Sequence, residues 1–257
     1  MRIPLLLTLL LLAGSGAVDA AETPLDSAKV ELQRAVNAAS APAISRARAA
    51  FLAQAAADPK SATAHYWVAV ADWRLAPMLL QAKDRKQASA VAKDGIGHCD
   101  RAAALDPSLA EAWALKAGLQ GLMISIEPSQ AMSLGPQTDA NLDRARTKAA
   151  DDPRIWLLDG INTLHKPGFF GGGPQRALEK LEKAQQLFEA PSASTDAFGW
   201  GRDDAWLWAG RCAMKLERYA DAEASFARAL EINPENRWVS GVLLPAAKEA
   251  RAKQASR

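Results

Sequence analysis

The sequence has little cysteine, histidine or net charge, and each shortage narrows the choice of function. Its 257 residues include two cysteines and three histidines, and the formal net charge is +2. Such a balance gives no strong field for nucleic acid or an anionic membrane. His65, His98 and His165 are followed by no second ligand three or four residues further on, so we expect no metal site. Cys99 and Cys212 fall in predicted helix cores, where we expect two buried free thiols rather than a disulfide.

The motifs of common catalytic sites are also missing. The chain has no Gly-x-Ser-x-Gly and no His-Glu-x-x-His, and we expect no cysteine to be paired with a near histidine as a nucleophile and its base. Its acidic residues are spread along predicted helix faces, as on a solvated surface. The run KPGFFGGGP could cradle a phosphate, but runs of glycine and proline are mainly turn signals, which favours a tight connection between helices with Phe169 and Phe170 packed into the stack. We therefore expect no enzyme activity and no cofactor.

The one long apolar run lies at the N-terminus. Residues 1–20 combine Arg2, an apolar stretch at 4–13 and a small-residue site ending at Ala20, which predicts a secretory signal peptide. The run is too short to span a membrane, and no cysteine follows it to carry a lipid. We expect residues 21–257 to form a single helical domain, periplasmic or secreted, with no membrane span after signal cleavage.

Residues 203–236 carry the clearest pattern, which indicates two helices packed as a hairpin. Ala222, Phe226 and Ala229 lie at i, i+4 and i+7 on one helix face. The two alanines let a neighbouring helix come close, and the phenylalanine fills the remaining space. A glycine on the first helix allows the same close approach, and a proline stops the second helix. The pattern consists of Trp206, Gly210, Tyr219, Ala222, Phe226, Ala229 and Pro234.

Weaker copies of this pattern precede it. Trp113 and Ala117, and then Trp156 and Gly160, repeat the spacing of Trp206 and Gly210, and prolines 59, 107, 153 and 234 mark unit ends. The units are longer than about 34 residues, the length of a plain repeat of this kind. The excess lies in three turns, 74–84, 121–138 and 166–173, which we expect to gather on one edge. We predict an all-α solenoid of stacked hairpins with enlarged turns inside the repeats and a capping helix at about 235–254.

The pattern resembles the tetratricopeptide repeat (TPR) family, most clearly over 203–236 and 108–121. That resemblance implies antiparallel helix pairs in a right-handed superhelix that binds peptides or proteins. The segments PGFFGGGPQRALEKLEKAQQLF, FGWGRDDAWLWAG and INPENRWVSGVLLP look like those of exported bacterial TPR proteins. The first is also similar to the TRAP-transporter T-component proteins, which are periplasmic, helical and thought to assist solute uptake.

Two functional hypotheses follow. The first is an exported, non-catalytic scaffold for a protein or peptide partner, with a groove face on the first helix of 203–236. Residues expected on that face are Leu207, Arg211, Met214 and Lys215, whose cations suit an acidic peptide. The alternative is a small-ligand accessory of a solute transporter, whose pocket the turns would enclose. Residues expected to line that pocket are Met78, Leu80, Met123, Ile126, Phe169 and Phe170. Neither hypothesis involves nucleic acid.

The eight tryptophans fall into two groups. Trp67, Trp113, Trp156 and Trp206 occupy comparable places in predicted first helices, so we expect them to be packing residues. The others are less regular, and we expect them to be partly exposed; these are Trp73, Trp200, Trp208 and Trp238.

Overall fold

The computed structural model describes residues 23–190 and 199–256, so the predicted signal peptide lies outside the described residues. The described residues form eleven α-helices and no β-strand. The helices are α1 (Pro24–Asn37), α2 (Ala41–Ala57), α3 (Ala62–Gln81), α4 (Arg85–Leu105), α5 (Ala110–Ile126), α6 (Ala131–Lys148), α7 (Pro153–His165), α8 (Pro174–Glu189), α9 (Arg202–Lys215), α10 (Tyr219–Ile232) and α11 (Leu244–Ala255). The predicted all-α solenoid is confirmed.

Side-chain caps and prolines set the helix ends. The hydroxyls of Thr23, Ser40 and Ser61 accept backbone N–H groups in the first turns of α1, α2 and α3. Asp58 and Asn233 end α2 and α10 directly before a proline, which disfavours helical geometry in the preceding residue. Local sequence therefore determines where most hairpins begin and end.

Most of the extra length between paired helices is helical, where the sequence suggested looped inserts. The helix α3 continues through Pro77 to Gln81, and α6 begins at Ala131 and includes Pro136. An interior proline removes a helix hydrogen bond at a cost of about 3 kcal/mol, which the packing of these long helices offsets. Only 166–173 is a compact turn, built on a short 3₁₀ helix, η2 (Gly168–Phe170), and two glycines with positive φ.

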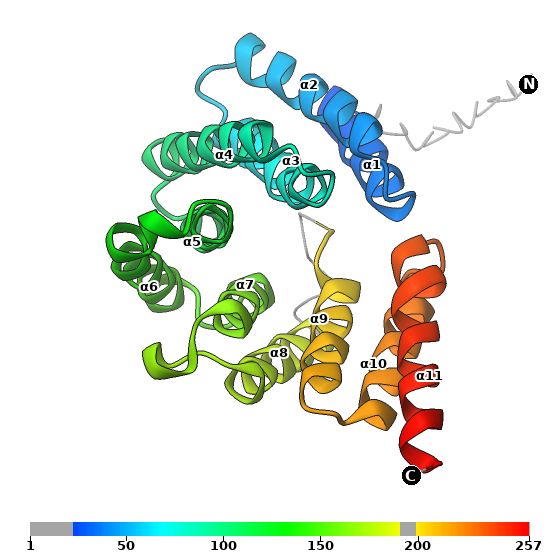
Figure 1. Cartoon of the computed structure of the whole chain (residues 1–257). Helices are drawn as coiled ribbons and strands as arrows, with labels where there is room; N and C mark the ends of the chain where they lie inside the picture. The colour runs from blue at the N-terminus through cyan, green and yellow to red at the C-terminus, as the bar shows by residue number, and fades with distance from the viewer. Residues whose placement is uncertain (1–22, 191–198, 257) are drawn as a thin grey trace, which may run out of the picture.

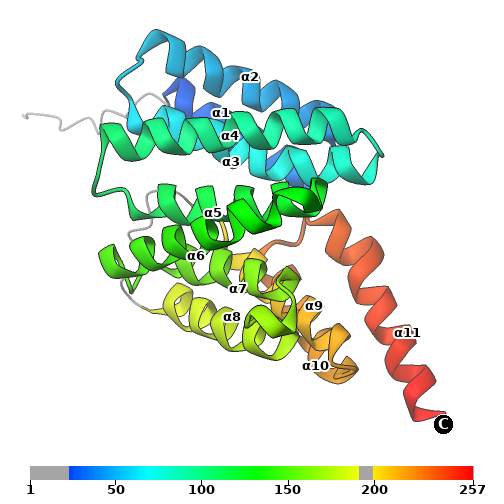
Figure 2. The same ribbon diagram turned by 60° about the vertical axis from the view of Figure 1, so that its left-hand side comes forward.

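Successive helices pack as pairs that follow a closed curve. The helices α3, α5, α7 and α9 line its inside, and α4, α6, α8 and α10 lie outside them (Figure 1). Seen from the side, the pairs form a stack and α11 lies beside it (Figure 2). The curve returns far enough for α1 to meet the segment after α10, where Asn37 hydrogen-bonds to Asn233 and Glu235.

Small residues bring the paired helices together as the pattern predicts. A Cβ on Gly210 would lie 2.5 Å from the ring of Phe226, and one on Gly160 would lie 2.7 Å from Leu181. Cys99 and Cys212 are buried and free, as expected. Within the described residues, no helix has both the length and the apolar character needed to cross a membrane.

Candidate functional site

Part of the inside of the curve is filled by Trp200, which is 5% exposed. Its indole Nε1 donates to the hydroxyl of Tyr66 on α3 at 3.1 Å, and its ring lies 5.5 Å from that of Trp73. The guanidinium groups of Arg74 and Arg154 each lie 5.5 Å from its ring centroid. The expectation that Trp73 and Trp200 are partly exposed is therefore wrong, because residues 199–201 lie inside the curve beside α3 (Figure 1), where Trp200 also contacts Arg154 on α7.

A buried ion pair fixes the start of α9 beside this tryptophan. Arg74 Nη1 donates to Asp204 Oδ1 at 2.8 Å, and a second hydrogen bond makes the pair bidentate. The side chains are 14% and 6% exposed. Asp204 also lies in the first turn of α9, where the helix dipole favours a negative charge. This pair and Trp200 join α3, α7 and α9 across the inside of the curve.

The buried carboxyl group of Glu111 interacts with Asp152 near the same filled region. Burial, with the charge and hydrogen bond of Asp152, raises the pKa of Glu111 to about 8, and nearby Arg154 only partly opposes this. Burial also raises the pKa of Tyr66. The inner polar groups at this end are therefore largely uncharged or paired at neutral pH, as expected of a structural interior.

We expect Glu111→Gln to stabilise the protein at pH 8 and not at pH 4. Folded Glu111 keeps its proton up to about pH 8, whereas the unfolded group loses it near 4.5. The folded state therefore binds more protons within this window, and stability falls as the pH rises through it. Glutamine can donate to Asp152 without titrating, so the gain at pH 8 should reach at most about 4 kcal/mol, because each unit of the shift from 4.5 to about 8 is worth about 1.4 kcal/mol. Urea unfolding at both pH values measures it; an equal effect at pH 4 and pH 8 would contradict the assignment.

The rest of the inner face of α9 is a stripe of aromatic and basic residues. Trp208, Arg211 and Lys215 follow Asp204 at helical spacing. The Arg211 guanidinium lies 4.2 Å from the Trp208 ring centroid and 5.4 Å from that of Trp238. Trp238 is 37% exposed. As expected, Trp208 and Trp238 are partly exposed, and they hold the Arg211 guanidinium between two rings.

Positive charge is not compensated at this stripe. Among the described residues, no carboxylate forms an ion pair with Arg211 or Lys215. Burial lowers the pKa of Arg211, and the neighbouring Cys212 thiol, rather than an aspartate or glutamate, opposes this effect. His165 at the end of α7 contacts Trp208 edge-on, and burial together with Arg211 and Lys215 lowers the pKa of His165. A partly desolvated guanidinium with free N–H groups is a candidate site for an anionic group.

The structure divides the groove residues expected from sequence. Arg211 and Lys215 lie on the inner stripe, together with Trp208, which was not among them. Leu207 is only 2% exposed and packs with Phe226 in a small apolar cluster shared with α10 and α11, so it is unavailable to a partner. Met214 packs against the same cluster. The stripe of Trp208, Arg211 and Lys215 is therefore rotated around α9 by about one residue from the face expected from the sequence.

The six residues expected to enclose a small ligand do not form a common pocket. Met123 and Ile126 are buried in the main core, and Met78 and Leu80 pack partly against it. Phe169 and Phe170 are 83% and 58% exposed, with ring centroids 4.2 Å apart. The proposed packing of these two phenylalanines into the stack is wrong, because the glycine turn holds them outward.

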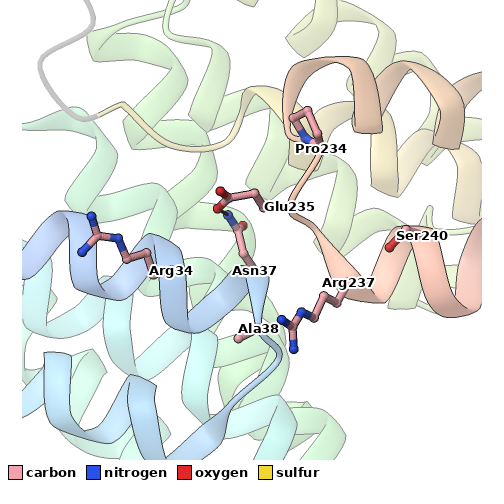
Figure 3. A pocket seen from close by; sticks show the side chains of 7 residues that line it. All are labelled: Arg34, Asn37, Ala38, Pro234, Glu235, Arg237 and Ser240. Carbon is pink, nitrogen blue, oxygen red and sulfur yellow. Dashed lines mark hydrogen bonds between the residues drawn. The ribbon is translucent and has the colours of Figure 1, made fainter.

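Two open cavities border α1. One, of about 390 Å³, lies between α1, α3 and the segment before α9, and its wall includes Val36, Trp67 and Trp200. The other, of about 420 Å³, lies where α1 meets the segment after α10 (Figure 3). Its lining is largely polar: Arg34, Asn37, Ala38, Pro234, Glu235, Arg237 and Ser240. Neither cavity includes any of the six residues expected to hold a small ligand.

Sequence reasoning missed several buried polar contacts. Asp72, Asp159 and Asp204 are buried, so the expectation of solvated acids is wrong for them. Each of the three forms an ion pair with a basic side chain from another helix. The partner of Asp72 is Arg48, but burial outweighs this pairing and raises the pKa of Asp72 to about 7. The distant histidines 65 and 98 face each other with Nδ1 atoms 2.8 Å apart. In the described part of the chain, no three His, Cys, Asp or Glu side chains gather as a metal site would require.

Comparison with known proteins agrees with this architecture. Residues 203–236 match the tetratricopeptide repeat family model. The HusA haemophore from Porphyromonas gingivalis is 20% identical, with a TM-score of 0.61 over 75% of this chain and 94% of that chain. A thermophilic TPR protein from Thermus thermophilus is 15% identical, with a TM-score of 0.60 over 89% of this chain and 97% of that chain. A search of curated protein sequences gave no match.

These likenesses concern the fold, because both identities are low. Together with the repeat matched at 203–236, they show that the chain has the helical solenoid fold of these proteins.

Proposed function

We propose that this chain is an exported, non-catalytic TPR scaffold that binds an acidic segment of a protein or peptide partner on the inner face of α9. The observation that carries the proposal is Arg211, a half-buried cation held between two tryptophan rings without a carboxylate partner. Export rests on the pattern of residues 1–20, and the mass of protein recovered from the periplasm, which should lack them, tests it.

The form of the site favours a peptide over an enclosed small molecule. Small-ligand sites are usually concave and bury most of the ligand. The stripe instead extends over three helical segments, from His165 on α7 across Trp208 and Arg211 to Trp238. An extended chain could place a carboxylate on Arg211 and apolar side chains on the exposed edges of the tryptophans. Lys215, one turn further along α9, would add a second, solvated positive charge.

We expect Arg211→Gln to weaken binding of an acidic peptide at least about tenfold, because a charge-assisted hydrogen bond contributes roughly 1.5–3 kcal/mol. The probe is a fluorescein-labelled nonapeptide of alternating glutamate and glycine, and a glutamine–glycine peptide is its neutral counterpart. Fluorescence anisotropy at low and high salt should show preference for the acidic peptide, declining with salt.

Arg228→Gln is the matched control. Arg228 also lies over a tryptophan, Trp206, but it pairs with Glu189 and Glu231 on the outer surface. Its substitution should leave peptide affinity unchanged. Equal binding of the acidic and neutral peptides, or equal effects of the two arginine substitutions, would refute the proposed site.

A further inference from the structure

The cavity of about 390 Å³ between α1 and α3 has aromatic walls that the core holds in place. Trp67, Val70 and Trp200 line it, and all three side chains are buried. Trp67 stacks on Phe51 with ring centroids 5.6 Å apart, and Trp200 donates its indole hydrogen to Tyr66. Because these rings are fixed from behind, the apolar surface that they present to the cavity is preorganised.

The rim of the cavity is partly apolar as well. Val30 on α1 lies at the rim and is 41% exposed, and Val36 on the same helix is half-buried. Lys29 lies 5.4 Å from the ring centroid of Trp67, but it pairs with Asp26, which also lines the cavity, so the two add no net charge. An apolar group that entered would remove the exposed valine and the tryptophan rings from water, which is favourable.

The cavity adjoins the stripe on α9. Arg74 lines the cavity and pairs with Asp204, the residue from which Trp208 and Arg211 follow at helical spacing. Arg211 lies seven residues after Asp204, which is about 10 Å along the helix. An extended chain advances about 3.3 Å per residue, so about three residues cover this length and one or two more reach past Arg74. A single extended segment can therefore contact Arg211 and the cavity together.

We propose that this cavity binds an apolar side chain of the acidic segment, about four or five residues from the carboxylate that binds Arg211. The assignment rests on the proposed function and adds a second requirement for the partner, an apolar residue such as leucine at a fixed separation from an acidic one. The other cavity bordering α1 offers no such walls, because Arg34, Glu235 and Arg237 are among its lining residues.

The separation is tested with fluorescein-labelled decapeptides of glycine and serine that carry one glutamate and one leucine. The two residues are adjacent or five positions apart, in both orders, and a third peptide has serine in place of leucine. In one of the two orders, the peptide with the wider separation should bind at least about fivefold more tightly than the others, since full burial of a leucine side chain would give more than this. Fluorescence anisotropy measures the affinities.

Substitutions on α1 show whether the leucine enters the cavity. Gln33→Trp places a large side chain in the cavity from a half-buried position and should remove the gain from leucine, while binding of the glutamate–glycine peptide stays unchanged. Glu31→Trp, at an exposed position of the same helix outside the lining, is the matched control and should keep the gain. Val30→Gln at the exposed rim should reduce the gain in part, and it provides the test if Gln33→Trp does not fold.

A diazirine analogue of leucine in the best peptide locates the side chain directly. Mass spectrometry should find its cross-links on α1, α3 or Trp200. Cross-links elsewhere, or a gain that both Gln33→Trp and Val30→Gln leave intact, would overturn the assignment of the cavity. Equal affinity with leucine distant, adjacent or absent would do the same while leaving the Arg211 site intact. A leucine gain without any effect of glutamate or of Arg211→Gln would refute the proposed function and leave an apolar site, and absence of binding by every peptide would refute both.

Discussion

Trp200→Ala should destabilise the protein by about 3–5 kcal/mol, the usual cost of truncating a large buried aromatic side chain. Trp200 is 5% exposed, contacts Trp73 and the guanidinium groups of Arg74 and Arg154, and donates its indole hydrogen to Tyr66. Its removal would leave a hole between α3 and α7 and leave the Tyr66 hydroxyl without this donor. Urea unfolding followed by circular dichroism measures the change.

Two further variants separate the causes. Trp200→Phe keeps an aromatic ring but removes the hydrogen bond to Tyr66, so it should cost less than alanine. Trp238→Ala removes a tryptophan that is 37% exposed and should cost least. If Trp200→Ala were no more destabilising than Trp238→Ala, the tryptophan would not be a structural part of the interior.

Contacts between residues that are close together in the sequence can be predicted from the sequence. The spacing of Gly210 and Phe226 gives the hairpin of 203–236 because both residues act within one pair of helices. The interior is different, since Tyr66 lies 134 positions and Arg74 130 positions from its partner. The spacing of residues along one helix does not reveal contacts with residues so far away in the sequence. From the sequence alone, Trp200 is therefore interpreted as a linker residue and Asp204 as a surface acid.

The proposed peptide site illustrates an intermediate case. Arg211 and Lys215 are recognisable as cations on a first helix, but Leu207 and Trp208 are both apolar neighbours in the same turn. Successive helix residues are separated by about 100°, and α9 packs against helices on two sides, so the pattern alone does not decide which of the two faces inward. Leu207 joins the core with α10 and α11, and this leaves Trp208 beside Arg211.

Asp204→Ala should cost about 3–5 kcal/mol, because it leaves the buried guanidinium of Arg74 without its bidentate partner. The double variant Arg74→Met with Asp204→Leu should be less destabilising than the single one, since no buried charge remains uncompensated. Both are measured by urea unfolding at neutral pH. Because Arg74 also contacts Trp200, the effects of Asp204→Ala and Trp200→Ala should not add.

The matched control is an exposed ion pair. Glu189→Ala removes one partner of Arg228, whose side chain is 41% exposed, and should change stability by about 0–1 kcal/mol. If Asp204→Ala had an effect of the same size, the Arg74 guanidinium would have to be solvated, and the interior between α3 and α9 would be open to water. A large cost for Asp204→Ala that the double variant reduces would instead establish that this ion pair, with Trp200, holds the first turn of α9 in place. The same helix carries Arg211 two turns further on, so its position depends on the filled part of the interior.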